Sequence, residues 1–432
     1  MQYLKIGTKA LFIIGILLVT GCKDRLIEKR TYMANVPIYM TYEQLNVSVA
    51  SEQPRALVSP GKIYFKDNYL FVNEVSKGIH IFDNSIPASP QKISFINIPG
   101  NVDIAIKGNV LYADNYTDLV AIDLNNITNG IVTKRISGVF PYSLPAHDPS
   151  YPLAKIDESL GVVIGWKIEE TTDICKDADC ESSYPNWAWA ESTGSMDNIF
   201  FAVYTPSALT PRSSGLGGSM ARFAVYDDYL YAINSSDLKL FNIANPSDPE
   251  SSSTIAIGWD IETIFPYNDK LFIGSQTGMF IYDLVNPSDP SFIAQFAHVR
   301  SCDPVVVEGD YAYVTLRSGN FCGGFNNQLD VIDISTLSSP QLIKSYPMTE
   351  PYGLGVDNGQ LFICDGDDGL KVYSVADPYA IDQNLLSHQA DINTFDVIPF
   401  NDVLMMIGDD GLYQYDYSDI SNLVLLSVIP VN

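Results

Sequence analysis

Two pairs of cysteines have a spacing that permits disulfide bonds. Cys175 and Cys180 stand five residues apart in one expected loop, and Cys302 begins an expected strand whose blade carries Cys322 in an enlarged hairpin. Disulfides persist in oxidising compartments, so both pairings apply to an exported chain, and the alternative is that all these thiols are reduced. Cys364 lies in an expected strand and is predicted to be a buried free thiol. Since no close Cys pair is matched by a second Cys or His pair, we expect no zinc site.

Two acidic tracts, CDGDDG at 364–369 and GDDG at 408–411, superficially resemble calcium-binding loops. Calcium takes about six to eight oxygen ligands, normally at staggered positions closed by a bidentate carboxylate. Neither tract has the full spacing of an EF-hand. Both tracts fall between an expected second and third strand, where an Asp-Gly pair favours a tight reversal. We therefore predict hairpin turns, with structural calcium as the alternative, and no other metal or cofactor.

Catalytic motifs are sparse in this chain. The four histidines are His80, His147, His298 and His388, and none falls in a nucleophile or metal motif. His80 lies within an expected strand and is predicted to be a packed or rim side chain. The chain has no G-x-S-x-G elbow, and its Gly-rich GLGGS stretch lacks the Lys and helix of a phosphate loop. We assign no catalytic residue, and an enzyme is the less favoured class.

The candidate binding surface consists of Trp187 and Trp189, in the sequence NWAWA of an acidic insertion. Exposed indole rings supply large stacking surfaces with a polar N–H at one end. The alternative is that both rings fix the insertion onto the body of the protein.

The N-terminus has the features of an export signal. Two lysines precede an apolar run at 10–19, which is shorter than the roughly 20 residues needed to span a bilayer. The residues VTGC at 19–22 resemble the lipobox of bacterial lipoproteins, although Leu is more usual than Val at its first position. The resemblance implies removal of residues 1–21 as a signal peptide and acylation of Cys22, which several acyl chains would anchor stably. Residues 22–50 are then expected to be the acylated cysteine and a tether.

The charge of the chain excludes some partners. Its formal net charge is −26, and the acidic residues are spread along the sequence rather than gathered in a tail. Such a surface repels the phosphates of nucleic acids and anionic headgroups. We therefore expect no nucleic-acid partner, and membrane association through the acyl chains alone.

A repeat organises the rest of the chain. YLYAINSSDLKLFNIANPSDP, from Tyr229, returns 41 residues later as KLFIGSQTGMFIYDLVNPSDP, from Lys270. Each copy contains two strands with alternating apolar and polar residues, a short polar turn and a Pro-Ser-Asp-Pro corner. A period of this length with several short strands is typical of a propeller blade. The predicted fold is all-β: a single β-propeller over residues 51–432.

Eight four-stranded blades are expected. The motif of the second strand recurs at Tyr69, Val110, Tyr229, Lys270, Tyr311, Gln360 and Val403. The interval between the second and third copies is too long for one repeat. Residues 152–170 have the pattern of an inner and a second strand, and residues 198–205 could supply a third. This degenerate unit makes eight blades, and the alternative is seven with an irregular excursion. Insertions are expected at about 171–197 and 205–219, where long loops often carry function.

LDVIDI from Leu329 and LVAID from Leu119 resemble the repeat of the LVIVD family, predicted bacterial β-propellers that are common as lipoproteins in Bacteroidota. The likeness covers roughly Arg55 to the C-terminus and is weakest between Pro141 and Met220. It implies an outer-membrane lipoprotein on the periplasmic or cell-surface side of that membrane. The family has no general catalytic assignment that can be carried over to this chain.

Two functions follow from these features. The favoured one is a lipid-anchored interaction module that contacts a partner protein in an envelope complex. The alternative is an extracytoplasmic hydrolase or glycan-binding protein with its site at the mouth of the propeller channel. An enzyme should have a deep polar pocket with converging carboxylates, His or bound metal, whereas an adaptor should have a broad exposed apolar or aromatic patch.

Overall fold

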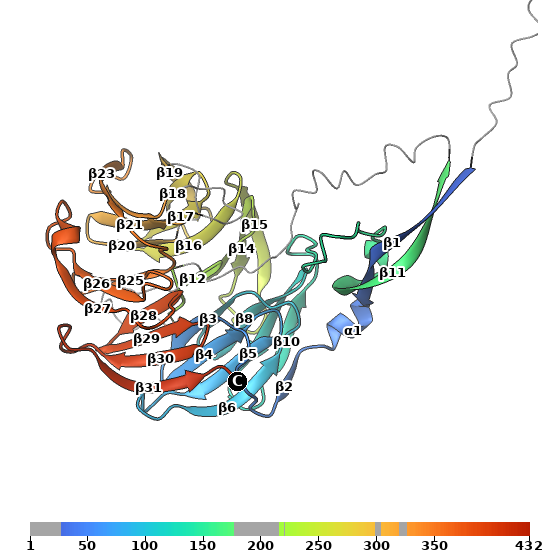
Figure 1. The fold of residues 1–432 in the computed structure, drawn as a ribbon, viewed down its shortest axis with the longest axis horizontal. Coiled ribbons are helices and arrows are strands. Elements are labelled where there is room, and N and C mark those ends of the chain that lie inside the picture. Colours follow the sequence, from blue (N-terminus) through green and yellow to red (C-terminus); the bar gives the residue numbers. More distant parts are fainter. Residues whose placement is uncertain (1–26, 177–215, 220, 299–303, 319–325) are drawn as a thin grey trace, which may run out of the picture. The chain divides into compact units, whose positions relative to one another are not determined.

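Seven antiparallel sheets are arranged as the blades of a ring in the computed structural model, which describes residues 27–176, 216–219, 221–298, 304–318 and 326–432 (Figure 1). In each blade the four strands follow one another along the chain, with the first strand innermost. The first blade gains a fifth strand, β2, at its outer edge. The protein is therefore a seven-bladed β-propeller. The prediction of eight blades is wrong, and the alternative of seven is correct.

The first three blades lie on either side of the long excursion in the chain. Blade 1 consists of β2 (Ala50–Glu52), β3 (Pro60–Lys66), β4 (Tyr69–Glu74), β5 (Gly78–Asp83) and β6 (Gln91–Asn97). Blade 2 consists of β7 (Ile104–Lys107), β8 (Val110–Asn115), β9 (Asp118–Asp123) and β10 (Ile131–Ile136). Blade 3 consists of β12 (Phe223–Tyr226), β13 (Tyr229–Ile233), β14 (Asp237–Asn242) and β15 (Glu250–Ala256).

The last four blades follow without a comparable excursion. Blade 4 consists of β16 (Ile261–Tyr267), β17 (Lys270–Ser275), β18 (Gly278–Asp283) and β19 (Ser291–Ala297). Blade 5 consists of β20 (Val305–Glu308), β21 (Tyr311–Leu316), β22 (Gln328–Asp333) and β23 (Gln341–Pro347). Blade 6 consists of β24 (Leu354–Asp357), β25 (Gln360–Cys364), β26 (Leu370–Ser374) and β27 (Leu385–Gln389). Blade 7 consists of β28 (Asp396–Phe400), β29 (Val403–Gly408), β30 (Gly411–Asp416) and β31 (Val424–Pro430).

The hydrophobic core lies between neighbouring blades rather than inside any one sheet. All six residues of β8 are buried, whereas β15 at the outer edge of its blade is almost entirely exposed. Because both faces of a blade are covered by its neighbours, the inner strands are apolar on both faces, and alternation appears only toward the rim. The turns between first and second strands carry Asn, Asp or Gly with positive φ, as in Asn358 (51°) and Gly359 (74°). These residues tolerate the tight reversal that a two-residue hairpin needs.

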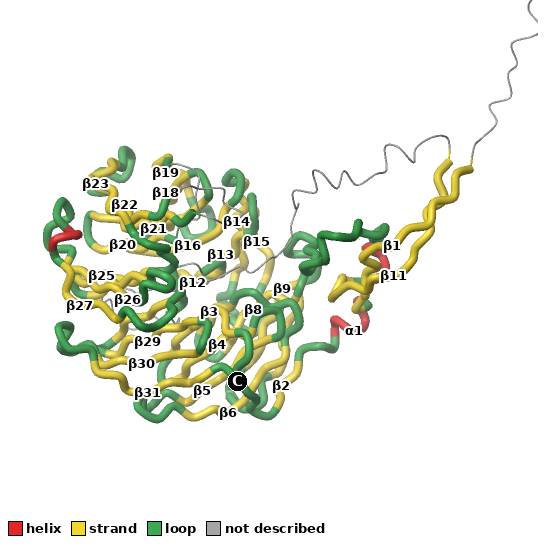
Figure 2. The backbone as a smooth tube through the Cα atoms, in the orientation of Figure 1, coloured by secondary structure: helices red, strands yellow, loops and turns green. Residues whose placement is uncertain are grey.

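The excursion between blades 2 and 3 does not form a blade. The chain divides into two units, of which the smaller comprises residues 1–39 and 144–195. In this unit β11 (Val162–Lys176) pairs with β1 (Ile27–Met40) in a two-stranded sheet (Figure 2). The tyrosine hydroxyl of Tyr32 donates to Asp173 at 2.6 Å, and the Thr31 and Thr172 hydroxyls are 2.9 Å apart.

This pairing explains why the eighth blade was predicted wrongly. Of residues 152–170, only the part from Val162 onward forms a strand, β11, and its partner is the segment after residue 26, which we expected to be part of a tether. A short 3-10 helix, Glu158–Leu160, precedes β11. Residues 198–205, the predicted third strand, lie outside the described residues. A helix, α1 (Tyr42–Asn46), follows β1, and among the described residues no helix is long and apolar enough to cross a membrane.

Candidate interaction face of the propeller

Two sets of loops share one face of the ring, which we call the B–C face. These loops join the second strand of a blade to the third, or the outermost strand of a blade to the innermost strand of the next. Since neighbouring strands in a blade are antiparallel, both kinds of loop lie at the same end, and the turns between first and second strands lie at the opposite end, the A–B face. The B–C face carries most of the polar side chains considered below.

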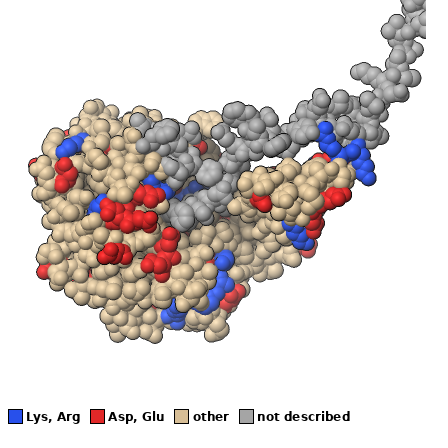
Figure 3. Space-filling model, in the orientation of Figure 1, with Lys and Arg blue, Asp and Glu red and all other residues tan. Residues whose placement is uncertain are grey.

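Acidic side chains gather on the B–C face of blades 6 and 7. Asp367, Asp409 and Asp410 are exposed, and Asp368 is half-buried. Figure 3 shows acidic residues clustered near the middle of the propeller face in view. Partial burial raises the pKa of Asp409, and the neighbouring charges of Asp367 and Asp410 raise it further. We call Asp367, Asp409 and Asp410 the acidic patch. These carboxylates repel one another, so a cationic group placed against them gains electrostatic energy.

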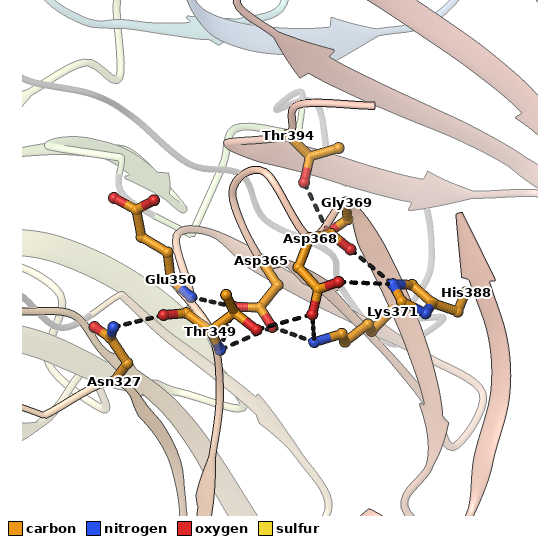
Figure 4. Close-up of polar contacts among 9 residues, drawn as sticks. All are labelled: Asn327, Thr349, Glu350, Asp365, Asp368, Gly369, Lys371, His388 and Thr394. Carbon is orange, nitrogen blue, oxygen red and sulfur yellow. Dashed lines mark hydrogen bonds and ion pairs between the residues drawn. The ribbon is translucent and has the colours of Figure 1, made fainter. Parts of the chain in front are cut away.

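Beneath the patch, a buried carboxylate joins two neighbouring loops (Figure 4). Asp365 accepts hydrogen bonds from the backbone N–H groups of Thr349 at 3.1 Å and Glu350 at 2.7 Å, and from the Lys371 ammonium at 2.5 Å. Asp368 binds the same ammonium at 2.5 Å and accepts the Thr349 hydroxyl at 2.8 Å. These bonds connect the loop that enters blade 6 to the hairpin of blade 6 itself. The cluster is therefore a fixed support for the acidic patch.

Charge pairing in this cluster is reflected in the pKa values. Hydrogen bonds from Lys371 and Thr349 lower the pKa of Asp368. Burial alone would lower the pKa of Lys371, but the hydrogen bonds and charges of Asp365 and Asp368 outweigh it, so that pKa lies above its usual value. Both partners are therefore held in their charged forms. The Nε2 atom of His388 lies 2.7 Å from the backbone oxygen of Asp368, which ties the outer strand of the blade to this hairpin.

The two acidic tracts form hairpin turns, as predicted. Gly408 pairs with Gly411 across a two-residue turn, and Cys364 pairs with Leu370 across the longer turn of blade 6. In the blade 6 turn the Lys371 ammonium stands between the two carboxylates that would be the first calcium ligands. Within the described part of the chain, no group of three or more His, Cys, Asp or Glu residues is placed to hold a metal ion.

A second polar group lies where the B–C face meets the channel. The Arg317 guanidinium stacks 3.8 Å from the centre of the Tyr352 ring, and its Nη1 atom lies 3.7 Å from Oε1 of Glu350. The Tyr352 hydroxyl donates to the same oxygen at 3.2 Å. Nearby, Gln276 donates to Glu262 at 3.1 Å. Burial raises the pKa of Glu262 to about 7, although the bond from Gln276 and the charge of Arg222 oppose it. Glu262 therefore titrates near neutral pH.

Charged residues also occupy equivalent positions around the channel. Lys62, Asp103, Arg222 and Asp396 each stand four residues before the end of the inner strand of their blade. The Lys62 ammonium lies 2.8 Å from Asp103 across the seam between blades 1 and 2, and both side chains are almost fully buried. Burial raises the pKa of Asp396, whose Oδ2 atom has no hydrogen-bond partner among the described residues. These four charged residues could have been found from the sequence, because they occupy the same position in four copies of the repeat.

The channel is not open. Residues Leu216–Ser219 and Ala221–Arg222 precede β12 and contact the inner strands of several blades. Ser219 is fully buried. A separate groove of about 220 Å³ lies between blades 2 and 3, lined by Ile136–Val139, Lys239–Phe241 and Ser251–Thr254. This is smaller than the roughly 300–1,000 Å³ typical of small-molecule sites.

Among the described residues of the B–C face, Trp259 is the most exposed large apolar side chain. It lies in the loop between β15 and β16 and is 82% exposed. Sequence reasoning missed this residue, because a single Trp in a short loop has no spacing that distinguishes it from a buried one. The tryptophans that were predicted to bind, Trp187 and Trp189, lie outside the described residues.

Most of the other predicted site residues also lie outside the described part of the chain. These are Cys22, Cys180, Cys302 and Cys322, and for Cys175 only the backbone, in β11, is described. Cys364 is a buried free thiol as predicted, and burial raises its pKa. His80 is packed as predicted: it is 2% exposed and lies 2.9 Å from Glu74.

Comparison with known proteins bears mainly on the fold. A model of the LVIVD repeat family matches residues 300–348, which include β20 to β23 of blade 5. No curated protein matches the chain.

Several solved structures are similar to this chain at low sequence identity. The computationally designed Ika8 protein is 9% identical, with 92% of this chain and 90% of that chain covered and a TM-score of 0.48. BamB from Moraxella catarrhalis is 7% identical over 90% of this chain and 97% of that chain, with a TM-score of 0.48. Sqt1 from Saccharomyces cerevisiae is 7% identical over 93% and 89%, with a TM-score of 0.49. Similarities of this size carry no information about function. The protein is thus a seven-bladed β-propeller that carries an LVIVD repeat.

Proposed function

We propose that this protein is a lipid-anchored binding module of the outer membrane, in which the propeller holds a partner protein of an envelope complex against its B–C face. The observation that carries this proposal is the contrast between a filled channel and a polar, partly aromatic outer face. A hydrolase or receptor for a small ligand needs a pocket that encloses its substrate. A protein partner needs a rigid surface with exposed contact groups, and the B–C face supplies Trp259 and the acidic patch.

The charge of the face indicates the chemistry of the partner. Asp367, Asp409 and Asp410 are exposed on a chain with a net charge of −26. Complementary charge steers association and sets specificity more than it sets affinity. The expected partner therefore presents a basic surface. Cys22 would hold the propeller at the membrane surface through its acyl chains, which concentrates it near such partners.

The test is an affinity pull-down of the full-length protein from its native outer membrane in mild detergent, followed by mass spectrometry. A triple variant, Asp367→Asn, Asp409→Asn and Asp410→Asn, removes three charges from the B–C face. Its matched control, Asp67→Asn, Asp310→Asn and Asp402→Asn, removes three charges from the turns of the A–B face. We expect a stoichiometric partner with the wild type and the control, and its loss with the B–C variant. A partnerless wild type, or equal loss with both variants, contradicts the proposal.

The anchor is tested separately. We expect Cys22→Ser to release the protein from the membrane fraction into the soluble fraction, because the thiol that carries the lipid is removed. Retention of the Cys22→Ser protein in membranes would show that another segment anchors it.

A further inference from the structure

The propeller ring is closed without strand exchange, so other contacts must hold it together. Each blade consists of strands that are consecutive in the chain, including the first and the last. At the seam between blade 7 and blade 1, the chain ends with a parallel bridge between Val431 and Leu57, and Asn432 donates its N–H to Leu57 at 2.9 Å. No outer strand is shared between these two blades. Apart from this short backbone bridge, the seam depends on contacts between side chains and on any segment that connects the blades near the axis of the ring.

The segment before β12 makes such a link with blade 1. The N–H of Phe65, in inner strand β3, donates to the carbonyl of Leu216 at 2.8 Å. The N–H of Leu216 donates back to the carbonyl of Phe65 at 2.7 Å. This reciprocal pair is the hydrogen-bonded arrangement of two antiparallel strands. Gly217 lies against the ring of Tyr64, where a Cβ atom would approach within 3.0 Å.

The same segment then reaches blades on other sides of the ring. The hydroxyl of Ser219 accepts the N–H of Leu354, in blade 6, at 3.3 Å. The carbonyl of Ala221 accepts the N–H of Ile264, in blade 4, at 2.8 Å. Blade 4 is three blades from blade 1 in a ring of seven, so a segment that touches both within a few residues must cross the channel. Figure 1 shows β12, which follows the segment, on the inner side of the ring.

Asp103 fastens the far end of the segment to blade 2. Its Oδ2 atom accepts the backbone N–H groups of Arg222 and of Phe223, the latter at 3.0 Å. The same carboxylate binds the Lys62 ammonium of blade 1 and accepts the N–H of Ile104 at 2.8 Å. One buried side chain thus joins blades 1 and 2 to the segment that leads into blade 3.

We propose that Leu216–Ser219 and Ala221–Arg222 form an internal clasp, which occupies the central channel and holds blades 1, 2, 4 and 6 in place of the strand exchange that this ring lacks. The clasp satisfies inner-strand N–H groups that would otherwise face the channel, which buried backbone groups require. The channel is therefore a structural interior and not a passage for ligands. The proposed binding function relies on the same filled channel, but not on the role of this segment in holding the blades together.

Hydrogen exchange of the full-length protein tests the clasp. A clasp variant, Leu216→Pro with Ser219→Ala, removes the N–H that bonds Phe65 and the hydroxyl that bonds Leu354. The matched control, Tyr112→Phe with Tyr231→Phe, removes two hydrogen bonds between blades at the rim. Measured relative to the amides of β30, we expect those of Phe65, Ile264 and Leu354 to exchange about tenfold faster or more in the clasp variant, and at an unchanged ratio in the control, where the lost hydroxyls lower stability as a whole. Equal acceleration in both variants, or none in the clasp variant, would overturn the proposal.

A measurement on the wild type keeps the proposal testable even if the clasp variant does not fold. Trypsin cleaves after Arg222 only if that residue leaves the channel. We expect this bond to be cut no faster than the whole protein unfolds, with the amides of Ile264 and Leu354 as protected as those of β14. Rapid cleavage after Arg222 in the native protein would show that the segment lies loosely in the channel and holds nothing.

Discussion

Asn84 and Gln414 lie 330 residues apart and exchange two side-chain hydrogen bonds across the seam that closes the ring. Asn84 donates to Oε1 of Gln414 at 2.9 Å, and Gln414 donates to Oδ1 of Asn84 at 2.8 Å. Both side chains are almost fully buried. Gln414 also donates to the carbonyl of Pro87 at 3.1 Å, and the Ser427 hydroxyl donates to the same carbonyl at 2.6 Å. Two amides thus satisfy each other at the place where the first and last blades meet.

Replacing one of these amides should weaken the closure. We expect Gln414→Leu to lower the free energy of unfolding by about 1–3 kcal/mol, because it leaves the Asn84 amide buried without its partner. Urea unfolding followed by circular dichroism measures this change. The double variant Asn84→Leu/Gln414→Leu should cost less than the sum of the two single variants, since it leaves no orphaned amide. Strict additivity would show that the two side chains do not act as a pair.

At three other seams, a tyrosine of one blade donates a hydrogen bond to the Pro-containing corner of the next blade. The Tyr112, Tyr231 and Tyr346 hydroxyls donate to the carbonyls of Pro246, Pro287 and Pro378 at 2.8, 2.6 and 2.7 Å. Each acceptor stands four residues after the end of the third strand of its blade, as does Pro87. The Pro-containing corner that marks the sequence repeat is therefore an attachment point between blades. Its role depends on a donor in the preceding blade.

Loss of one corner bond should have a modest and local cost. We expect Tyr231→Phe to destabilise the protein by about 1 kcal/mol, because the substitution keeps the ring and removes only the hydroxyl. Tyr229→Phe is the control, since Tyr229 is partly exposed and no hydrogen bond of its hydroxyl is seen within the described residues. Thermal unfolding of the three proteins side by side gives the comparison. A larger loss in the Tyr229 variant would contradict the assignment.

The repeat made the propeller predictable, but the blade count needed information that the repeat does not contain. Residues 152–170 have a sequence pattern like that of blade strands. An alternating pattern indicates that one face of a strand is buried, but it does not indicate which element covers that face. The partner, β1, comes from a segment that was interpreted as a tether. The hairpin turns of the acidic tracts were predictable because their signal is local. The contacts of Asp103 were not, because its partners come from blade 1 and from a segment more than a hundred residues away.

We expect the free energy of unfolding to fall at acid pH, in part because Glu74 becomes protonated. Burial alone would raise the pKa of Glu74, but hydrogen bonds from His80 and from the backbone of Val58 and Ser59 lower it from 4.5 to about 2. A carboxyl whose pKa is depressed on folding stabilises the protein above its unfolded pKa, and this contribution is lost as the pH falls from 4.5 toward 2. We expect Glu74→Gln to remove about 3 kcal/mol of stability at pH 7 and little at pH 2.

Urea unfolding at several pH values measures this dependence. The slope of stability against pH between 4.5 and 2 should be shallower in Glu74→Gln than in the wild type. Glu52→Gln is a suitable control, because Glu52 is exposed and its ion pair with Arg55 is long, at 3.6 Å. A parallel pair of curves for wild type and Glu74→Gln would show that this carboxyl contributes no pH dependence.

The ion pairs of Lys371 and Lys134 contrast a buried pair with an exposed one. The Lys371 ammonium is the counter-ion of Asp365, whose side chain is fully buried, and it lies 2.5 Å from that carboxylate. Lys371→Met leaves this charge without its cation, so we expect a loss of about 3–5 kcal/mol. Lys134→Met breaks an equally short contact, 2.6 Å to Asp248, but both of those side chains are exposed. Its expected cost is at most about 1 kcal/mol, because water and salt screen the exposed pair.

If the two variants lose equal stability, the Lys371 cluster does not support the acidic patch in the way its geometry indicates. A large loss confined to Lys371→Met, reduced in Asp365→Asn/Lys371→Met, would identify the unpaired carboxylate as the cause.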